Sequence, residues 1–244
     1  MDLDFTGKSV LITGAASGIG AACATWLQAR GAERLILIDR EESGFCSPVT
    51  FVGDVADPAL WEHIEARAGP IDHAIINAGI SPGGTIADTS FEDWRQVLSV
   101  NLDGAFLSLR TALRLMRDGS SAVMTSSVAG LKAQPGTAAY SASKAGLIQL
   151  MKVAAREAAP RGIRINAIAP GGVDTPIWDK QPVFRESFEA MGRAEALDSM
   201  ARQSVPLGRF ETAEEIAAQI GFLLSPLAGT ISGTVLVSDG GYTL

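Results

Sequence analysis

Residues 8–20 read Lys-Ser-Val-Leu-Ile-Thr-Gly-Ala-Ala-Ser-Gly-Ile-Gly, an apolar run that leads into a glycine-rich turn. Lys8–Thr13 is typical of a short buried strand. The alanine-rich segment Ala21–Arg30, which ends at Gly31, predicts a helix. Glycines at such a turn let the backbone approach a pyrophosphate, and the N-terminus of the helix offers free N–H groups. The stretch therefore predicts an α/β fold with a phosphate-binding turn.

An aspartate ends the next predicted strand, Arg34–Asp39. It follows the glycines by about twenty residues, where a carboxylate accepts both ribose hydroxyls of NAD and repels the 2′-phosphate of NADP. The alternatives are a tight turn without a ligand and an aspartate that only ends its strand. The glycine turn and the aspartate together favour a dinucleotide. Arg40 is able to bind a 2′-phosphate, whereas Ala16 supplies no second cation. We expect NAD rather than NADP.

Strand and helix segments alternate along the rest of the chain, and the strands are apolar throughout. This pattern predicts an α/β fold in one domain over residues 1–244, a Rossmann-type doubly wound parallel β-sheet with helices on both faces. Further strands are expected at Val49–Gly53, Ile71–Asn77, Ser121–Ser126, Ile163–Ala169 and Val235–Val237. Further helices are expected from Asp57-Pro58 to about Ala68, from Ser90 to about Met116, over Thr137–Ala159 and over Thr212–Ser225.

The link between Asp39 and Val49 contains Gly44 and Pro48 and is too short for a crossover helix, so we expect a loop or a single turn. Cys23 and Cys46 have no metal or disulfide spacing, which favours a reducing compartment.

The chain has a net charge of -7 and no block of like charges, which argues against nucleic acid or an anionic membrane as a partner. No signal peptide and no apolar run of ~18 residues is present, so we expect a cytoplasmic protein. His63 and His73 lack ligand-spaced acids or cysteines. We expect them at the surface or at a strand edge, and we expect no metal site.

A hydroxyl pair at Ser126 and Ser127 ends an apolar run, and Tyr140 and Lys144 follow, one helical turn apart. A lysine there favours the phenolate, although moving a tyrosine pKa from ~10 to ~7 takes roughly 4 kcal/mol. We expect a bound cationic nicotinamide ring to supply the remainder. The alternatives are a packing tyrosine and a strand-end serine bonded to backbone. Tyr242, the only other tyrosine, is expected in the tail, away from this site.

With these pieces in order, the chain resembles a classical short-chain dehydrogenase/reductase over essentially its full length. Each matching piece is short, but together they are specific. The pieces are Thr13–Gly20, Asp54-Val55, Asn77-Ala78-Gly79, Asn101, Ser127, Tyr140 with Lys144, and Pro170-Gly171. Two features depart from the family: Ile76 replaces a usual asparagine, and the absent helix after Asp39 implies a more open adenine pocket.

The resemblance implies a catalytic set of Asn101, Ser127, Tyr140 and Lys144. Tyr140 would exchange a proton with the substrate oxygen, and Ser127 would hydrogen-bond that oxygen. Asn101 would hold a water that links Lys144 to solvent; without the resemblance, a solvent-facing polar residue would be the simpler interpretation. The cofactor set implied by the family is Gly14, Ser17, Gly18, Ile19, Gly20, Asp39, Asp54, Val55, Asn77, Ala78, Gly79, Tyr140, Lys144, Pro170, Gly171, Val173 and Thr175.

Residues 174–206 contain many apolar side chains and are expected to hold one or two helices and to close over the substrate as a lid. Ordinary packing is an equal alternative for any one of them. The side chains are Ile177, Trp178, Val183, Phe184, Phe188, Met191, Leu197 and Met200. Gly83, Gly84 and Gln134 are expected on the opposite side of the pocket.

The sequence thus predicts an oxidoreductase that transfers a hydride between NAD(H) and a secondary alcohol or ketone, with a bulky apolar small molecule as substrate. One alternative is an NADPH-dependent reductase of 3-oxoacyl chains on a carrier protein, for which Arg110, Arg114 and Arg117 would offer a basic docking patch. Another is an NAD-binding sensor without turnover. The resemblance also implies a homotetramer, assembled through the long helices and the last strand.

Overall fold

A parallel sheet forms the centre of the computed structural model, which describes residues 3–45, 49–179 and 182–244. Its seven strands run in the order β3-β2-β1-β4-β5-β6-β9. They are β1 (Ser9–Thr13), β2 (Arg34–Asp39), β3 (Val49–Val52), β4 (Ile71–Ile76), β5 (Met116–Thr125), β6 (Arg164–Pro170) and β9 (Val235–Ser238). A second small sheet pairs β7 (Val173–Asp174) with β8 (Glu211–Thr212). The expected doubly wound α/β fold is confirmed.

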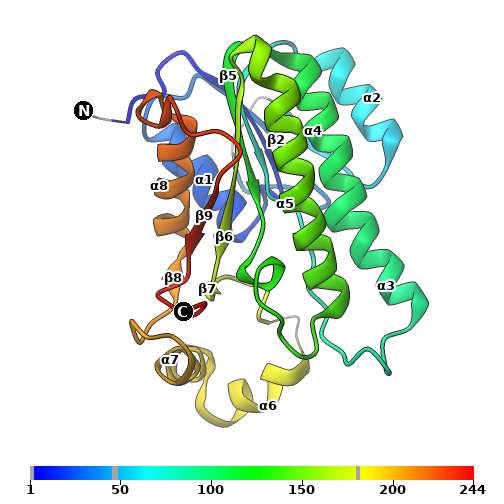
Figure 1. The fold of residues 1–244 in the computed structure, drawn as a ribbon, viewed down its shortest axis with the longest axis vertical. Coiled ribbons are helices and arrows are strands. Elements are labelled where there is room, and N and C mark those ends of the chain that lie inside the picture. Colours follow the sequence, from blue (N-terminus) through cyan, green and yellow to red (C-terminus); the bar gives the residue numbers. More distant parts are fainter. Residues whose placement is uncertain (1–2, 46–48, 180–181) are drawn as a thin grey trace.

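Helices cover both faces of the sheet (Figure 1). Helices α1 (Gly18–Gln28) and α8 (Ala213–Leu224) pack together on one face, whereas α2 (Pro58–Arg67), α4 (Gly104–Leu115) and α5 (Ala138–Ala158) cover the other. Successive residues of β1 alternate between these layers: Val10 and Ile12 belong to one hydrophobic cluster and Leu11 to the other. Strands buried on both faces explain the uniformly apolar strand sequences.

The helix expected from Ser90 to Met116 is interrupted by a π-helical turn. Helix α3 (Phe91–Leu98) is followed by the π turn Ser99–Asp103 and then by α4. The chain turns into β5 at Met116, earlier than the predicted Ser121. The extra residue of a π turn has no signature in the apolar pattern, so the sequence did not reveal it.

The helix boundaries otherwise follow the predicted caps. Asp57 accepts a hydrogen bond from Ala59 N, and Thr212 and Glu215 form the expected reciprocal capping box. Helix α1 begins at Gly18, three residues before the predicted start, because the last part of the glycine turn is already helical. Residues 40–45 contain no helix, as expected. Cys46 and Pro48 lie outside the described residues.

His73 lies in the core, which contradicts the expected surface or strand-edge position. Its Nδ1 is 2.9 Å from the Ser121 hydroxyl, which itself donates to the Leu224 carbonyl. Its ring packs edge-on against Phe5. Burial lowers the His73 pKa to about 4. Whether a strand residue faces the core depends on the neighbouring strands and helices, which a single segment does not reveal. His63 is exposed, as expected.

The carboxyl ends of all the parallel strands meet at one edge of the sheet, and β1 and β4, from which the chain winds in opposite directions, lie side by side. Such a switch point opens a crevice for ligands. Two helices, α6 (Pro182–Met191) and α7 (Arg193–Ser204), stand at the same end of the molecule (Figure 1). They fall within residues 174–206, where one or two helices were expected.

Candidate active site

A cavity of about 790 Å³ lies at this edge and collects most of the residues singled out in the sequence. Gly20 and Asn101 are the two members of the predicted catalytic and cofactor-binding sets that do not line it. Those that do are Gly14, Ser17, Gly18, Ile19, Asp39, Asp54, Val55, Asn77, Ala78, Gly79, Ser127, Tyr140, Lys144, Pro170, Gly171, Val173 and Thr175.

The glycine turn has the backbone conformation that its sequence suggests. Gly14 and Gly18 have φ angles of 69° and 54°, which residues other than glycine rarely adopt. A Cβ on Gly20 would lie 2.0 Å from the Gly14 carbonyl oxygen. Gly20 therefore permits close packing within the turn, while Gly14 and Gly18 shape the cavity wall.

Asp39 ties the end of β2 to the glycine turn. Its Oδ2 accepts a hydrogen bond from Ala16 N at 2.8 Å, and its Oδ1 accepts one from Glu41 N at 3.2 Å. The aspartate thus has the strand-end capping role that we considered as the alternative. It also lines the cavity together with Arg40 and Glu41, and each carboxylate oxygen retains a further lone pair.

Asn77 joins β4 to β1 at the switch point. Its backbone N–H donates to Thr13 Oγ1 at 2.9 Å, and its Nδ2 donates to the Thr13 carbonyl at 3.3 Å. These bonds fix the position of Ala78 and Gly79 beside the glycine turn. A Cβ on Gly79 would lie 3.4 Å from Lys144 Nζ, so a glycine keeps this wall clear.

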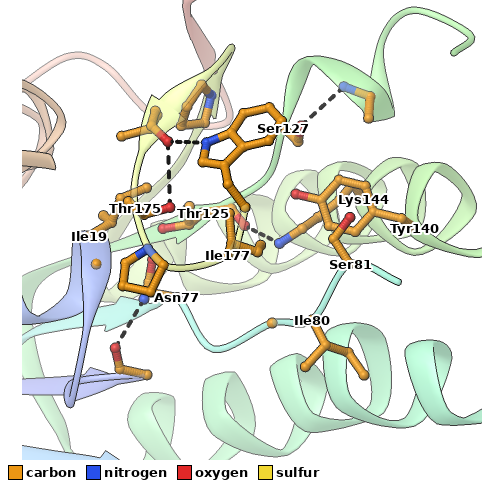
Figure 2. Close-up of a pocket in the computed structure, with 18 of the residues that line it drawn as sticks. Ile19, Asn77, Ile80, Ser81, Thr125, Ser127, Tyr140, Lys144, Thr175 and Ile177 are labelled. Carbon is orange, nitrogen blue, oxygen red and sulfur yellow. Dashed lines mark hydrogen bonds between the residues drawn. The ribbon is translucent and has the colours of Figure 1, made fainter. Parts of the chain in front are cut away.

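Ser127, Tyr140 and Lys144 meet on the other side of the cavity (Figure 2). Lys144 is buried, and its Nζ donates to the Thr125 carbonyl at 2.8 Å and lies 5.6 Å from the centroid of the Tyr140 ring. Burial lowers the Lys144 pKa to about 8. Burial also raises the Tyr140 pKa above its ordinary value, and hydrogen bonding with Ser127 opposes that rise. Without a cofactor, Lys144 does not lower the tyrosine pKa on balance.

Asn101 is fully buried in the π turn, so the solvent-facing interpretation is wrong. Its Oδ1 accepts a bond from Ile80 N at 2.8 Å, and its Nδ2 donates to the Ile80 carbonyl at 2.9 Å and to Ser143 Oγ at 3.1 Å. The side chain therefore braces the loop after β4 against α5. Through that loop it supports the wall beside Lys144.

Aromatic rings line the end of the cavity beyond Tyr140. Trp178 stacks on Phe210 with ring centroids 5.5 Å apart and planes at 7°, and it meets Phe184 edge-on at 4.9 Å. Ile177 and Met200 also line the cavity, as expected. Phe188, Met191 and Leu197 do not; Leu197 is buried, which agrees with the packing alternative. The Val183 side chain lies outside the described part of the structure.

Of the three residues expected across from these rings, Gln134 lines the cavity, but Gly83 and Gly84 do not. Tyr242 also lines the cavity, which contradicts the expectation that the tail lies away from the site. Lys132 Nζ donates to the Tyr242 carbonyl at 2.8 Å, and Asp239 accepts bonds from Gly241 N and Thr243 N. These contacts fold the tail back.

Several other lining residues had no sequence signal, because they reach the cavity through tertiary contacts. They are Ile80, Ser81, Pro82, Gln96, Val100, Thr125, Val128, Thr137, Gln203, Ser204, Val205 and Phe210. Among the described side chains, no three His, Cys, Asp or Glu residues group as a metal site requires. None of the described helices combines the length and hydropathy of a membrane-spanning segment.

This combination of switch-point cavity, glycine turn and serine–tyrosine–lysine cluster defines an oxidoreductase of the Rossmann type. Residues 14–243 match the family model described as "Enoyl-(Acyl carrier protein) reductase". The chain belongs to the short-chain dehydrogenase/reductase family, as the sequence motifs indicated.

Three similar proteins illustrate the range of the family. An uncharacterised short-chain type dehydrogenase/reductase of Sinorhizobium fredii is 38% identical over 97% of the chain, which spans 44% of that longer protein. The 3-oxoacyl-[acyl-carrier-protein] reductase of Thermotoga maritima is 36% identical over 98% of each chain. The crystal structure of levodione reductase is 35% identical, with a TM-score of 0.86 over 97% of this chain and 98% of that one. The two named activities differ, so similarity alone does not select a substrate.

Proposed function

We propose that the protein transfers a hydride between NAD(H) and a secondary alcohol or ketone that carries a bulky apolar group. The observation that carries the proposal is the meeting of Ser127, Tyr140 and Lys144 in one cavity with the glycine turn. A dinucleotide fits this cavity because Gly14 and Gly18 hold the turn in conformations that leave its wall free of side chains. The Ser17–Gly20 segment would hold the pyrophosphate at the N-terminus of α1.

The chemistry divides between the cofactor and three side chains. The nicotinamide ring, when bound, would supply or take up the hydride. Tyr140 takes the hydroxyl proton from the alcohol, or returns a proton to the ketone oxygen. Ser127 hydrogen-bonds the same oxygen, and Lys144 holds the ribose and favours the phenolate. The raised Tyr140 pKa keeps the phenol protonated at neutral pH before cofactor binds, which is the form that ketone reduction needs.

The preference for NAD is supported by the charges at the end of β2. Asp39, Arg40 and Glu41 all line the cavity there, so two carboxylates accompany the one guanidinium. A 2′-phosphate would meet net negative charge at this position. Arg40 is exposed and lies beside an acid, so it would bind a 2′-phosphate only weakly.

Reduction of 3-oxoacyl chains on a carrier protein, with NADPH as the expected donor, is the second candidate. The Thermotoga maritima relative is named a 3-oxoacyl-[acyl-carrier-protein] reductase. The docking patch that this activity needs is poorly developed. Arg114 pairs with Glu65 at 3.0 Å, and Arg117 pairs with Asp72 at 3.1 Å, so acids offset two of the three arginines. A sensor without turnover is less well supported, because Ser127, Tyr140 and Lys144 are all in place.

A screen of secondary alcohols and ketones with both cofactors tests the proposal. We expect NAD⁺ reduction with apolar cyclic or branched alcohols, and little activity with NADP⁺. Turnover of 3-oxoacyl thioesters with NADPH alone would favour the second candidate. Dinucleotide binding with no turnover on any substrate would favour the sensor.

We also propose a homotetramer, on the family resemblance and on exposed apolar side chains of the long helices and the last strand. Phe106 on α4, Val153 on α5 and Val237 on β9 are 47%, 45% and 41% exposed. Exposed apolar residues of this kind often mark subunit contacts. The cytoplasmic location stays a prediction.

A further inference from the structure

Thr125 ends β5, two residues before Ser127, and occupies an unusual position in the cavity wall. The residue is 5% exposed and lines the cavity, and its carbonyl oxygen accepts the hydrogen bond from Lys144 Nζ. Its hydroxyl oxygen is buried and has no hydrogen-bond partner among the described residues. Figure 2 shows the Lys144 side chain reaching the Thr125 carbonyl oxygen in the cavity wall.

A buried hydroxyl without a partner destabilises a fold, and native proteins contain few of them. The residues before Thr125 in β5, Ala122, Val123 and Met124, are buried and apolar, so a valine would suit the sheet equally well. The chain retains a threonine at the one position of this run that lines the cavity. This placement indicates a partner that enters with a ligand.

We propose that the Thr125 hydroxyl hydrogen-bonds the nicotinamide half of the bound dinucleotide and positions it against Tyr140. This inference rests on the proposed function. The residue lies beside Ser127 and Lys144, whereas the adenine half is expected at Asp39, at the far end of the cavity. Both the carboxamide and the ribose of the nicotinamide half carry groups that pair with a hydroxyl. Thr125 is thus a positioning residue, since it takes no part in proton transfer.

Thr111 supplies a matched control, because its hydroxyl is also buried without a described partner. It lies on α4, is fully buried and does not line the cavity. The isosteric changes Thr125→Val and Thr111→Val each remove one such hydroxyl. We expect both variants to melt at or above the temperature of the wild type, because each loses an unsatisfied polar group.

The affinity for the cofactor distinguishes Thr125→Val from Thr111→Val. Titration with NADH, followed by nicotinamide fluorescence, should give a dissociation constant about three- to tenfold higher for Thr125→Val, the range of one hydrogen bond. Thr111→Val should match the wild type, and Thr125→Ser should recover most of the affinity. Nicotinamide mononucleotide should show the same weakening with Thr125→Val, whereas ADP, measured by calorimetry, should bind all four proteins equally.

An unchanged NADH affinity in Thr125→Val would overturn the inference, as would an equal loss for ADP. A lower melting temperature that Thr125→Ser restores would assign the hydroxyl to the fold instead. If the wild type binds neither NADH nor NADPH, the proposed function itself fails. That outcome is distinct, because it appears before any variant is compared.

Discussion

Tyr140 and Lys144 have shifted proton affinities before any ligand arrives. Burial lowers the pKa of Lys144 to about 8 and raises that of Tyr140. Both shifts have the same cause, because burial disfavours the charged form of each side chain. A cofactor that contacts Lys144 and brings a positive ring would reverse the balance for the tyrosine. Proton transfer would then be coupled to cofactor binding.

Replacement of Tyr140 by Phe tests the role of the phenol in proton transfer. We expect turnover of the best alcohol to fall by about 10²–10⁴-fold, because the proton acceptor is lost. NADH binding should change little. Tyr242→Phe removes the other phenol of the cavity and should keep activity within a few-fold of the wild type. Initial rates and NADH titrations on the three proteins decide the point; high residual turnover in Tyr140→Phe contradicts the assignment.

Among the helices, α7 is fastened by one arginine to the turn that follows β7. Arg193 contacts Asp174 at 2.6 Å and Asp179 at 2.7 Å, and its Nη2 donates to the Thr175 carbonyl at 3.0 Å. Thr175 and Trp178 in this turn line the cavity. The clamp therefore holds this part of the cavity wall in place.

Substitution Arg193→Ala should raise KM for the alcohol by roughly three- to thirtyfold, because the turn must then be ordered by the substrate itself. Cleavage by trypsin or chymotrypsin within residues 174–206 should become faster. Arg202→Ala, which removes the pair between Arg202 and Asp198 on the exposed side of the same helix, is the control. Equal kinetics in both variants would show that the clamp has no role in the site.

Across the whole molecule, features encoded by local sequence could be predicted, whereas features that depend on tertiary contacts could not. The succession of strands and helices along the chain, the glycine turn and the caps of α2 and α8 are local or periodic signals, and all were predictable. The burial of His73, the π turn around Asn101 and the return of Tyr242 to the cavity depend on contacts between distant segments. Phe210 gave no signal for the same reason: it reaches the cavity by packing on Gly172, where a Cβ would lie 2.3 Å from its ring.

Stability towards acid should depend on His73. Its pKa is about 4 in the fold and near 6.5 in the unfolded chain, so the unfolded state binds more protons between these values. The stabilising effect of neutral His73 is present above pH ~6.5 and is lost as the pH falls towards ~4, by up to about 3 kcal/mol.

Urea unfolding of the wild type, His73→Asn and the exposed-site control His63→Asn at several pH values measures this effect. The His73 variant should have a flatter dependence of the unfolding free energy on pH between 6.5 and 4. The control should follow the wild type. Identical slopes in all three proteins would contradict the burial argument.

The proposed homotetramer can be tested by measuring the mass of the protein in solution. Light scattering after size exclusion should give four chains for the wild type. Phe106→Glu, which places a charge on α4, should give smaller species, because burying an unpaired carboxylate is costly. Leu207→Glu, at an exposed residue outside the long helices and the last strand, should leave the mass unchanged. A wild-type monomer would contradict the proposed tetramer.

We expect this cavity to bind NAD through the glycine turn and Asp39. Parallel titrations of the wild type with NADH and NADPH, followed by nicotinamide fluorescence, test it directly. We predict saturable binding of NADH with an affinity at least about tenfold above that of NADPH, because two carboxylates at the end of β2 disfavour a 2′-phosphate. Tighter binding of NADPH, or no binding of either dinucleotide, would contradict the account.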